Sequence, residues 1–322
     1  MLYIGTAGFS YQDWKGAFYP EAQDKKYMLE YYSSRFPVVE VNSTWHALPS
    51  PRTLYSMARR TSIDFQFIVK VYQGLTHKYR ENREDFARFR EVIRPLEDYG
   101  KLACLLAQFP WGFKNTPANR GYLRLFRELL PSRDVVVEFR NEEWITDETT
   151  ELLRELGMGF CCVDEPRLKG LVRPHVILTS HIGYVRFHGR NYQAWWDRNR
   201  ESWERYDYLY NEDELREWVP GLLALDGEAE RTYAIFNNHY RGKAPRNAAM
   251  LASLLPPERV VSLREGEKTM RLWGGQGRVK PTVCLGRHAR SPGKRGACRG
   301  SCAAGARRAS ARCAIPWRSP SG

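Results

Sequence analysis

The sequence predicts an α/β protein, a single (β/α)8 TIM-type barrel, from three observations. Short apolar runs that fit strands buried on both faces recur along the chain. Segments with apolar residues at helical spacing separate most of these runs, so the strands should be parallel. Eight such units fit within about 260 residues, which is the size of a closed barrel. A doubly wound open sheet is disfavoured, because no Gly-x-Gly-x-x-Gly follows an early strand.

The expected strands are short and rich in β-branched, aliphatic and aromatic residues. Most of them end in polar residues. In a barrel the carboxyl ends of parallel strands gather at one rim, where reaction sites are built. The strands are expected at residues 2–6, 38–43, 65–70, 102–108, 134–139, 159–163, 183–188 and 232–237.

Helices are expected after most strands. Near 84–97, apolar residues from Phe86 to Leu96 recur on one helical face. Asn211 with Glu214 forms a capping-box pattern, and the weakest unit is the sixth, since residues 165–182 show no helical face. The other helices are expected near 25–35, from Pro51, over Leu123–Leu130, over Leu152–Leu156 ending at Gly157, and from Pro245.

The charge is unevenly distributed along the chain. The 322 residues carry a formal net charge of +13, but residues 273–322 hold 11 Lys or Arg and no Asp or Glu. Residues 1–272 therefore hold 39 basic against 37 acidic residues. Because the barrel region is nearly neutral, the basic character of the chain is not an argument that the barrel binds nucleic acid.

The composition predicts a barrel domain over 1–271 and a low-complexity, disordered basic tail over 272–322. The tail is interpreted as out-of-frame sequence or as a basic arm for nucleic acid or membrane. Four of the seven cysteines lie there, and their irregular spacing is weak support for zinc. The sequence has no membrane span and no signal peptide at its start, so we expect a soluble, cytoplasmic protein.

Several motifs in order resemble the YecE-like proteins of domain-of-unknown-function family 72. The resemblance covers roughly residues 1–263 and implies a TIM-type barrel of unsettled function, without an established catalytic residue. The tail has no counterpart in it. The matching motifs are Gly5-Thr6-Ala7-Gly8-Phe9-Ser10-Tyr11 with Trp14, Phe18-Tyr19-Pro20, Val39-Glu40-Val41-Asn42-Ser43-Thr44, Gln108-Phe109-Pro110, Glu138-Phe139-Arg140 with Trp144, Tyr184-Val185-Arg186-Phe187-His188-Gly189, and Phe236-Asn237-Asn238-His239 with Gly242, Ala244-Pro245 and Asn247-Ala248.

The predicted rim supplies the candidate site residues. Glu138 or Asp164 is expected to act as a general base, with His188 as its acid partner and Glu40 as a further carboxylate. A glycosidase would pair Glu138 with one of these other carboxylates. The expected ligand-binding residues are Lys70, Arg140 and Arg186 for an anionic group, Asn42, Asn237 and Asn238 for hydroxyls or an oxyanion, and Gln108, His239 and Trp14 at the same rim.

The same charges also fit a different role, an ion-pair lattice that closes the barrel end. A Glu138→Gln substitution separates the two. With a catalytic Glu138, folding is expected to stay nearly intact while ligand binding or turnover changes. With a lattice, stability is expected to fall without a functional effect.

The leading interpretation is an enzyme that acts on a polar or anionic small molecule by carboxylate and histidine acid–base chemistry. A hydrolase or lyase is slightly favoured over an isomerase. The alternatives are a nucleic-acid-binding or phosphodiester-processing protein, with nucleic acid bound mainly through the tail, and a non-catalytic ligand-binding barrel. No cofactor is predicted, and a divalent metal is not favoured because the strand ends lack an HxH or HxxE cluster. The sequence does not indicate an oligomeric state.

Overall fold

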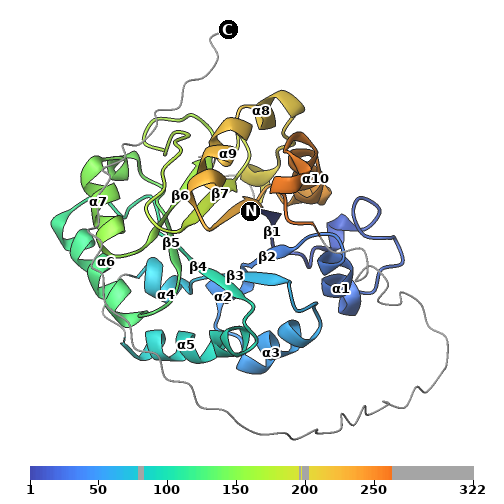
Figure 1. The fold of residues 1–322 in the computed structure, drawn as a ribbon, viewed down its shortest axis with the longest axis horizontal. Coiled ribbons are helices and arrows are strands. Elements are labelled where there is room, and N and C mark those ends of the chain that lie inside the picture. The colour runs from blue at the N-terminus through green and yellow to red at the C-terminus, as the bar shows by residue number, and fades with distance from the viewer. Residues whose placement is uncertain (79–82, 196, 198–202, 263–322) are drawn as a thin grey trace, which may run out of the picture. The chain divides into compact units, whose positions relative to one another are not determined.

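A computed structural model describes residues 1–78, 83–195, 197 and 203–262. Eight parallel strands close into one barrel, in which each strand pairs with its sequence neighbours and β8 returns to β1 (Figure 1). The predicted fold class is confirmed, and each expected strand lies within two residues of the observed one. The strands are β1 (Leu2–Ala7), β2 (Val38–Val41), β3 (Gln66–Lys70), β4 (Leu102–Gln108), β5 (Val135–Glu138), β6 (Gly159–Asp164), β7 (Ile182–Phe187) and β8 (Arg231–Phe236).

Helices surround the strands (Figure 1). Their ends follow local chemistry. The Ser50 hydroxyl caps α3, the predicted capping box of Asn211 and Glu214 opens α8, and Gly157 takes a positive φ of 60° after α7. The helices are α1 (Met28–Ser33), α2 (Ser43–His46), α3 (Pro51–Arg59), α4 (Gln73–Thr76), α5 (Arg83–Asp98), α6 (Pro117–Leu129), α7 (Asp147–Glu155), α8 (Glu212–Arg216), α9 (Val219–Glu228) and α10 (Lys243–Leu254).

The sixth unit differs from the others, as the sequence predicts. Residues 165–181 contain no helix, and β7 follows an irregular segment. The domain boundary after residue 271 and the tail at 272–322 lie outside the described residues, so both stay predictions. Within the described ranges, no helix combines the length and the apolar character needed to cross a membrane.

Side chains alternate between the barrel interior and the helices, because successive strand residues point to opposite faces. Val38, Ile68 and Val136 belong to a cluster of buried residues that fills the interior. Two residues further along each strand, the same inward positions hold Glu40, Lys70 and Glu138. The outward neighbours pack in a second cluster under the helices, which includes Phe139 and Phe187. The alternation thus delivers charged side chains to the inner carboxyl-end rim.

Candidate functional site

Arg186 connects the carboxylates of two other strands inside the barrel. Its Nη2 and Nε donate to Glu40 at 2.6 and 3.0 Å, and its Nη1 donates to Glu138 at 2.8 Å. The Tyr184 hydroxyl adds a 2.9 Å hydrogen bond to Glu40. Glu40 and Glu138 are fully buried and Arg186 is 1% exposed, so these charges compensate one another. Strands β2, β5 and β7 are therefore tied together at this rim.

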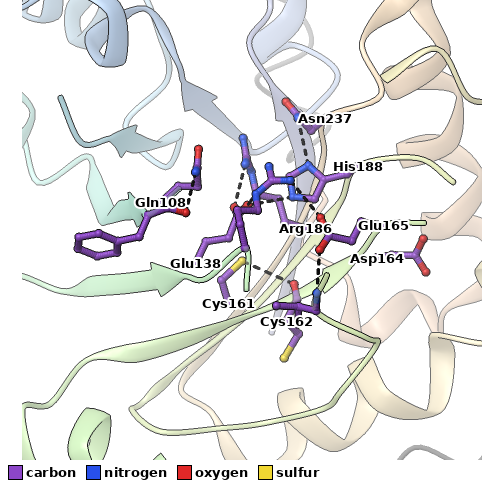
Figure 2. A network of polar contacts seen from close by, with 12 residues as sticks. Gln108, Glu138, Cys161, Cys162, Asp164, Glu165, Arg186, His188 and Asn237 are labelled. Carbon is purple, nitrogen blue, oxygen red and sulfur yellow. Dashed lines mark hydrogen bonds and ion pairs between the residues drawn. The ribbon is translucent and has the colours of Figure 1, made fainter. Parts of the chain in front are cut away.

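Glu138 is the most heavily bonded carboxylate of this group. Besides Arg186, it contacts Arg140 Nε at 2.6 Å and His188 Nε2 at 3.1 Å (Figure 2). Burial alone would raise the pKa of Glu138, but the positive charges of Arg140 and then Arg186 outweigh it and hold that pKa well below its usual range. A carboxylate stabilised in this way is a weak proton acceptor. The geometry therefore argues against Glu138 as the general base.

His188 also has both ring nitrogens engaged. Nε2 faces Glu138 and must donate to it, while Nδ1 lies 3.1 Å from the side-chain amide nitrogen of Asn237. Burial, followed by the charge of Arg140, lowers the pKa of His188 to about 3. The ring is therefore neutral at physiological pH and accepts at Nδ1. His188 and Asn237 orient Glu138 and leave no free proton donor for a ligand.

Arg140 extends the network to a carboxyl group that the sequence analysis did not nominate. Its Nη1 lies 3.0 Å from Glu165, whose other oxygen accepts from the Val172 amide at 3.2 Å. Burial raises the pKa of Glu165 to about 8, although the charge of Arg140 opposes the shift. Arg140 is shared with Glu138, which its Nε approaches more closely. Glu165 is thus largely protonated at neutral pH and able to donate a proton. We call Glu40, Glu138, Glu165, Arg140 and Arg186 the rim lattice.

Lys70 lies at the carboxyl end of β3 and has a different environment. Among the described residues its amine has no hydrogen-bond or ion-pair partner, and its contact is with the ring of Trp45, at 5.0 Å from the centroid. Burial, followed by the charge of Arg186, lowers the pKa of Lys70 to about 7. Near neutral pH, this amine therefore exists in both its charged and its neutral form.

Two further polar atoms beside β2 lack partners. Asn42 Oδ1 and Trp45 Nε1 are buried and make no hydrogen bond with any residue that the structure describes. The Thr44 hydroxyl between them donates to the Lys70 carbonyl at 2.7 Å, so α2 is anchored against the end of β3. A buried acceptor and a buried donor left open are rare in folded proteins and indicate a missing partner.

His77, which the sequence analysis passed over, belongs to the same rim. Its ring lies 5.1 Å from the ring of Trp45, centroid to centroid. Burial and then the charges of Lys70 and Arg140 lower the pKa of His77 to about 4. His77 directly follows the short helix α4, and no local sequence pattern predicts that it lies at this rim.

The expectation that Asp164 faces the same site is not met. Asp164 follows Phe160 and Cys162 in the outward phase of β6, and its carboxylate points away from Glu138 and Arg186 (Figure 2). Its partners lie in the loop after β7, just before α8 and between α8 and α9. They are Arg190 Nη2 at 2.7 Å, Tyr210 Oη at 2.7 Å and Trp218 Nε1 at 2.7 Å. We call this the outer Asp164 cluster, because it places the Asp164 carboxylate outside the barrel and apart from the rim lattice.

Trp14 and Asn238 also differ from expectation. Trp14 is fully buried and donates from Nε1 to the His239 carbonyl at 2.6 Å, so its ring is not accessible to a ligand. Asn238 donates to Tyr208 and Asn247 outside the barrel, at 2.9 and 2.8 Å. Both residues hold loops together and do not offer groups to the rim.

Two expected binding residues are placed at the margin of the site. The His239 ring stacks on Tyr11, with centroids 4.8 Å apart, and burial lowers the pKa of its imidazole. Gln108 is 8% exposed and donates from Nε2 to the Phe109 carbonyl at 2.9 Å (Figure 2). Neither residue touches the rim lattice through a hydrogen bond in the described part of the chain.

The described residues contain no group of three or more His, Cys, Asp or Glu side chains that could hold a metal ion. The cysteines at 104, 161 and 162 are buried and unpaired, as expected of small apolar side chains. The proposed contact with nucleic acid depended mainly on residues 272–322, which are not among the described residues.

Comparison with known proteins identifies the family. The family described as "Protein of unknown function DUF72" matches residues 3–270. The UPF0759 protein YunF of Bacillus subtilis is 32% identical over 273 residues, covering 80% of this chain and 96% of YunF.

Solved structures agree with this assignment. A DUF72 family protein from Thermotoga maritima is 40% identical, with a TM-score of 0.74 over 79% of this chain and 98% of its own. Another, from Enterococcus faecalis, is 28% identical, with a TM-score of 0.70 over 79% of this chain and 95% of its own. Together with the closed barrel and the motifs along its strands, these matches show that the chain belongs to the DUF72 family.

Proposed function

We propose that the protein is an enzyme that acts on a small anionic molecule at the carboxyl-end rim of the barrel. The observation that carries this proposal is the unpartnered amine of Lys70 beside a rim lattice whose charges are otherwise paired. An incoming carboxylate or phosphate would give Lys70 an ion-pair partner, which the described residues do not provide. Arg140, which is 12% exposed, supplies a second positive charge near it.

The acid–base pair of this proposal is Lys70 and Glu165, in place of Glu138 and His188. The pKa of Lys70 is lowered to about 7 and that of Glu165 is raised to about 8. A neutral amine and a protonated carboxyl group can therefore coexist near pH 7, one to accept and one to donate a proton. Two titratable groups whose pKa values are shifted in opposite directions are typical of acid–base catalysis.

This pair favours a lyase or an isomerase over a hydrolase with two carboxylates. In a glycosidase, one carboxylate must attack carbon or activate water. Glu40 and Glu138 are both engaged by Arg186, at 2.6 and 2.8 Å. Proton transfer by Lys70 and Glu165 is better suited to a carbon acid or to the release of a leaving group.

Isothermal titration with inorganic phosphate and with pyruvate tests the anion site. Binding of an anion raises the pKa of Lys70, so at about pH 7.5 the protein should take up protons. Titrations in buffers of different ionisation enthalpy measure that uptake. The exposed Lys25→Met variant is the control and should behave as wild type.

The Lys70→Met variant should bind these anions at least about ten-fold more weakly, without proton uptake. Binding that is unchanged in Lys70→Met would contradict the proposed site. Proton-linked binding without turnover of any anionic substrate tested would instead support the non-catalytic ligand-binding barrel.

A further inference from the structure

The environment of Lys70 is that of a reactive amine, as comparison with Lys101 shows. The Lys101 side chain is buried, whereas Lys70 is partly exposed, and the Lys101 ammonium donates to the Ala58 carbonyl at 2.6 Å, the Thr61 carbonyl at 2.8 Å and the Thr61 hydroxyl at 3.0 Å. Those bonds use all three of its protons. Lys70 has none of them in the described part of the chain, so its nitrogen lone pair is free to react when the amine is neutral.

The atoms around Lys70 are suited to a carbonyl compound. Asn42 Oδ1 is an open acceptor and Trp45 Nε1 an open donor, and Thr44 fixes both next to the end of β3. A hydroxyl group on the ligand would satisfy the acceptor, and a carbonyl or acid oxygen would satisfy the donor. The rim thus provides a nucleophile, a hydrogen-bond donor and a hydrogen-bond acceptor within one short stretch of structure.

We propose that Lys70 forms an imine with an aldehyde or ketone that also carries a carboxylate or a phosphate. This proposal rests on the anion site proposed above. The Nζ lone pair forms a bond to the carbonyl carbon, and the carbonyl π electrons move to oxygen. Proton transfer from nitrogen to oxygen gives a neutral carbinolamine. A proton from solvent then reaches the hydroxyl group, which leaves as water while the nitrogen lone pair forms the C=N bond.

The step is balanced without an oxidant or a reductant. One amine, one carbonyl group and one proton give one protonated imine and one water. The positive nitrogen then accepts electrons from a neighbouring C–H or C–C bond, which is the chemistry of isomerases and lyases. The same imine would explain why the protein holds Lys70 near other cations, since Arg186 disfavours the ammonium form.

Reductive trapping tests the imine directly. The full chain is incubated at pH 7 with sodium cyanoborohydride and one of four probes: pyruvate, glyoxylate, dihydroxyacetone phosphate or glyceraldehyde 3-phosphate. Peptide mass spectrometry then follows each lysine. With at least one probe, Lys70 should be alkylated at least about ten-fold faster than the exposed Lys25 and Lys26. Lys101 is the buried internal control and should stay unmodified.

A further measurement sharpens the result. Acetone, a neutral analogue of pyruvate, should react with Lys70 at least about ten-fold more slowly than pyruvate does. Equal rates for acetone and pyruvate would overturn the assigned substrate class.

Failure of the imine is distinguishable from failure of the anion site. If no probe labels Lys70 faster than Lys25, the imine is overturned. Proton-linked phosphate binding that is lost in Lys70→Met would in that case still support the proposed function. If both the labelling and the proton-linked binding are absent, both proposals are overturned.

Discussion

The two ends of the barrel differ in whether their charged side chains have partners. At the amino end, Lys101 has three acceptors, and Asp226 pairs with the Met1 amino group at 2.5 Å and with Arg259 at 2.6 Å. Asp134 pairs there with His181 at 3.1 Å. At the carboxyl end the rim lattice is paired as well, but Lys70 is not. The difference indicates that one end is organised for stability, while the other keeps a charge available for a ligand.

The largest expected effect is on the rim lattice itself. Glu138→Gln removes the charge that Arg186 and Arg140 face inside the barrel, and breaking a buried ion pair in this way costs about 3–5 kcal/mol. Urea denaturation measures the loss. Glu148→Gln, at an ion pair with Arg120 in which Glu148 is 63% exposed, should change stability by less than about 1 kcal/mol. A Glu138→Gln variant that keeps wild-type stability but loses ligand binding would restore Glu138 as a functional carboxylate.

Lys101→Met examines the amino end. The substitution leaves two carbonyl oxygens and a hydroxyl without their donor, and unsatisfied buried groups cost about 1–3 kcal/mol. The variant should therefore unfold at a lower urea concentration than wild type. It should also bind phosphate normally, because Lys101 lies before β4 and not at the rim. Loss of phosphate binding with unchanged stability would break the distinction between the two ends.

Lys70→Met is the matched change at the other end, and we expect no loss of stability at pH 7. Within the described ranges, Lys70 makes no hydrogen bond that the substitution would remove, and its charge is partly desolvated. The variant should be as stable as wild type or more stable. A loss as large as that of Lys101→Met would mean that Lys70 is a structural lysine.

The difference in stability between wild type and Lys70→Met should also depend on pH. The folded protein releases the Lys70 proton near pH 7, whereas the unfolded chain holds it to the ordinary value of 10.5. Between these values the unfolded state binds more protons, so wild-type stability gains with rising pH relative to Lys70→Met. Any advantage of the variant should thus shrink from pH 7 to about pH 10. The opposite contribution of Glu165 is present in both proteins and cancels. A difference that stays constant with pH would argue against a lowered Lys70 pKa.

Much of the site could be predicted from strand alternation. Glu138, Arg186 and His188 share one phase with the inward residues of their strands, and the structure brings these three together. The same alternation places Asp164 and Glu165 on opposite faces at the end of β6. Asp164 follows Cys162 in the outward phase, so the next residue is the one that turns inward.

The roles of the residues could not be predicted in the same way. Whether Glu138 is a base or a bound counter-ion depends on its contacts with Arg140, Arg186 and His188. Arg186 lies on β7, and Arg140 and His188 follow the ends of β5 and β7. The burial of Trp14 depends on the loop after β8, which supplies the acceptor for its ring nitrogen. Pairing across the barrel is a property of the closed fold, and it leaves no pattern in the local sequence.

The most direct test is a titration of Lys70 itself by NMR of the protein with isotope-labelled lysine side chains. The Lys70 signal is assigned by its absence in Lys70→Met, and the exposed lysines provide the reference. The account predicts a midpoint near pH 7 that shifts upward when phosphate is bound. A midpoint above about pH 9.5, in the range of lysine in model peptides, would contradict it.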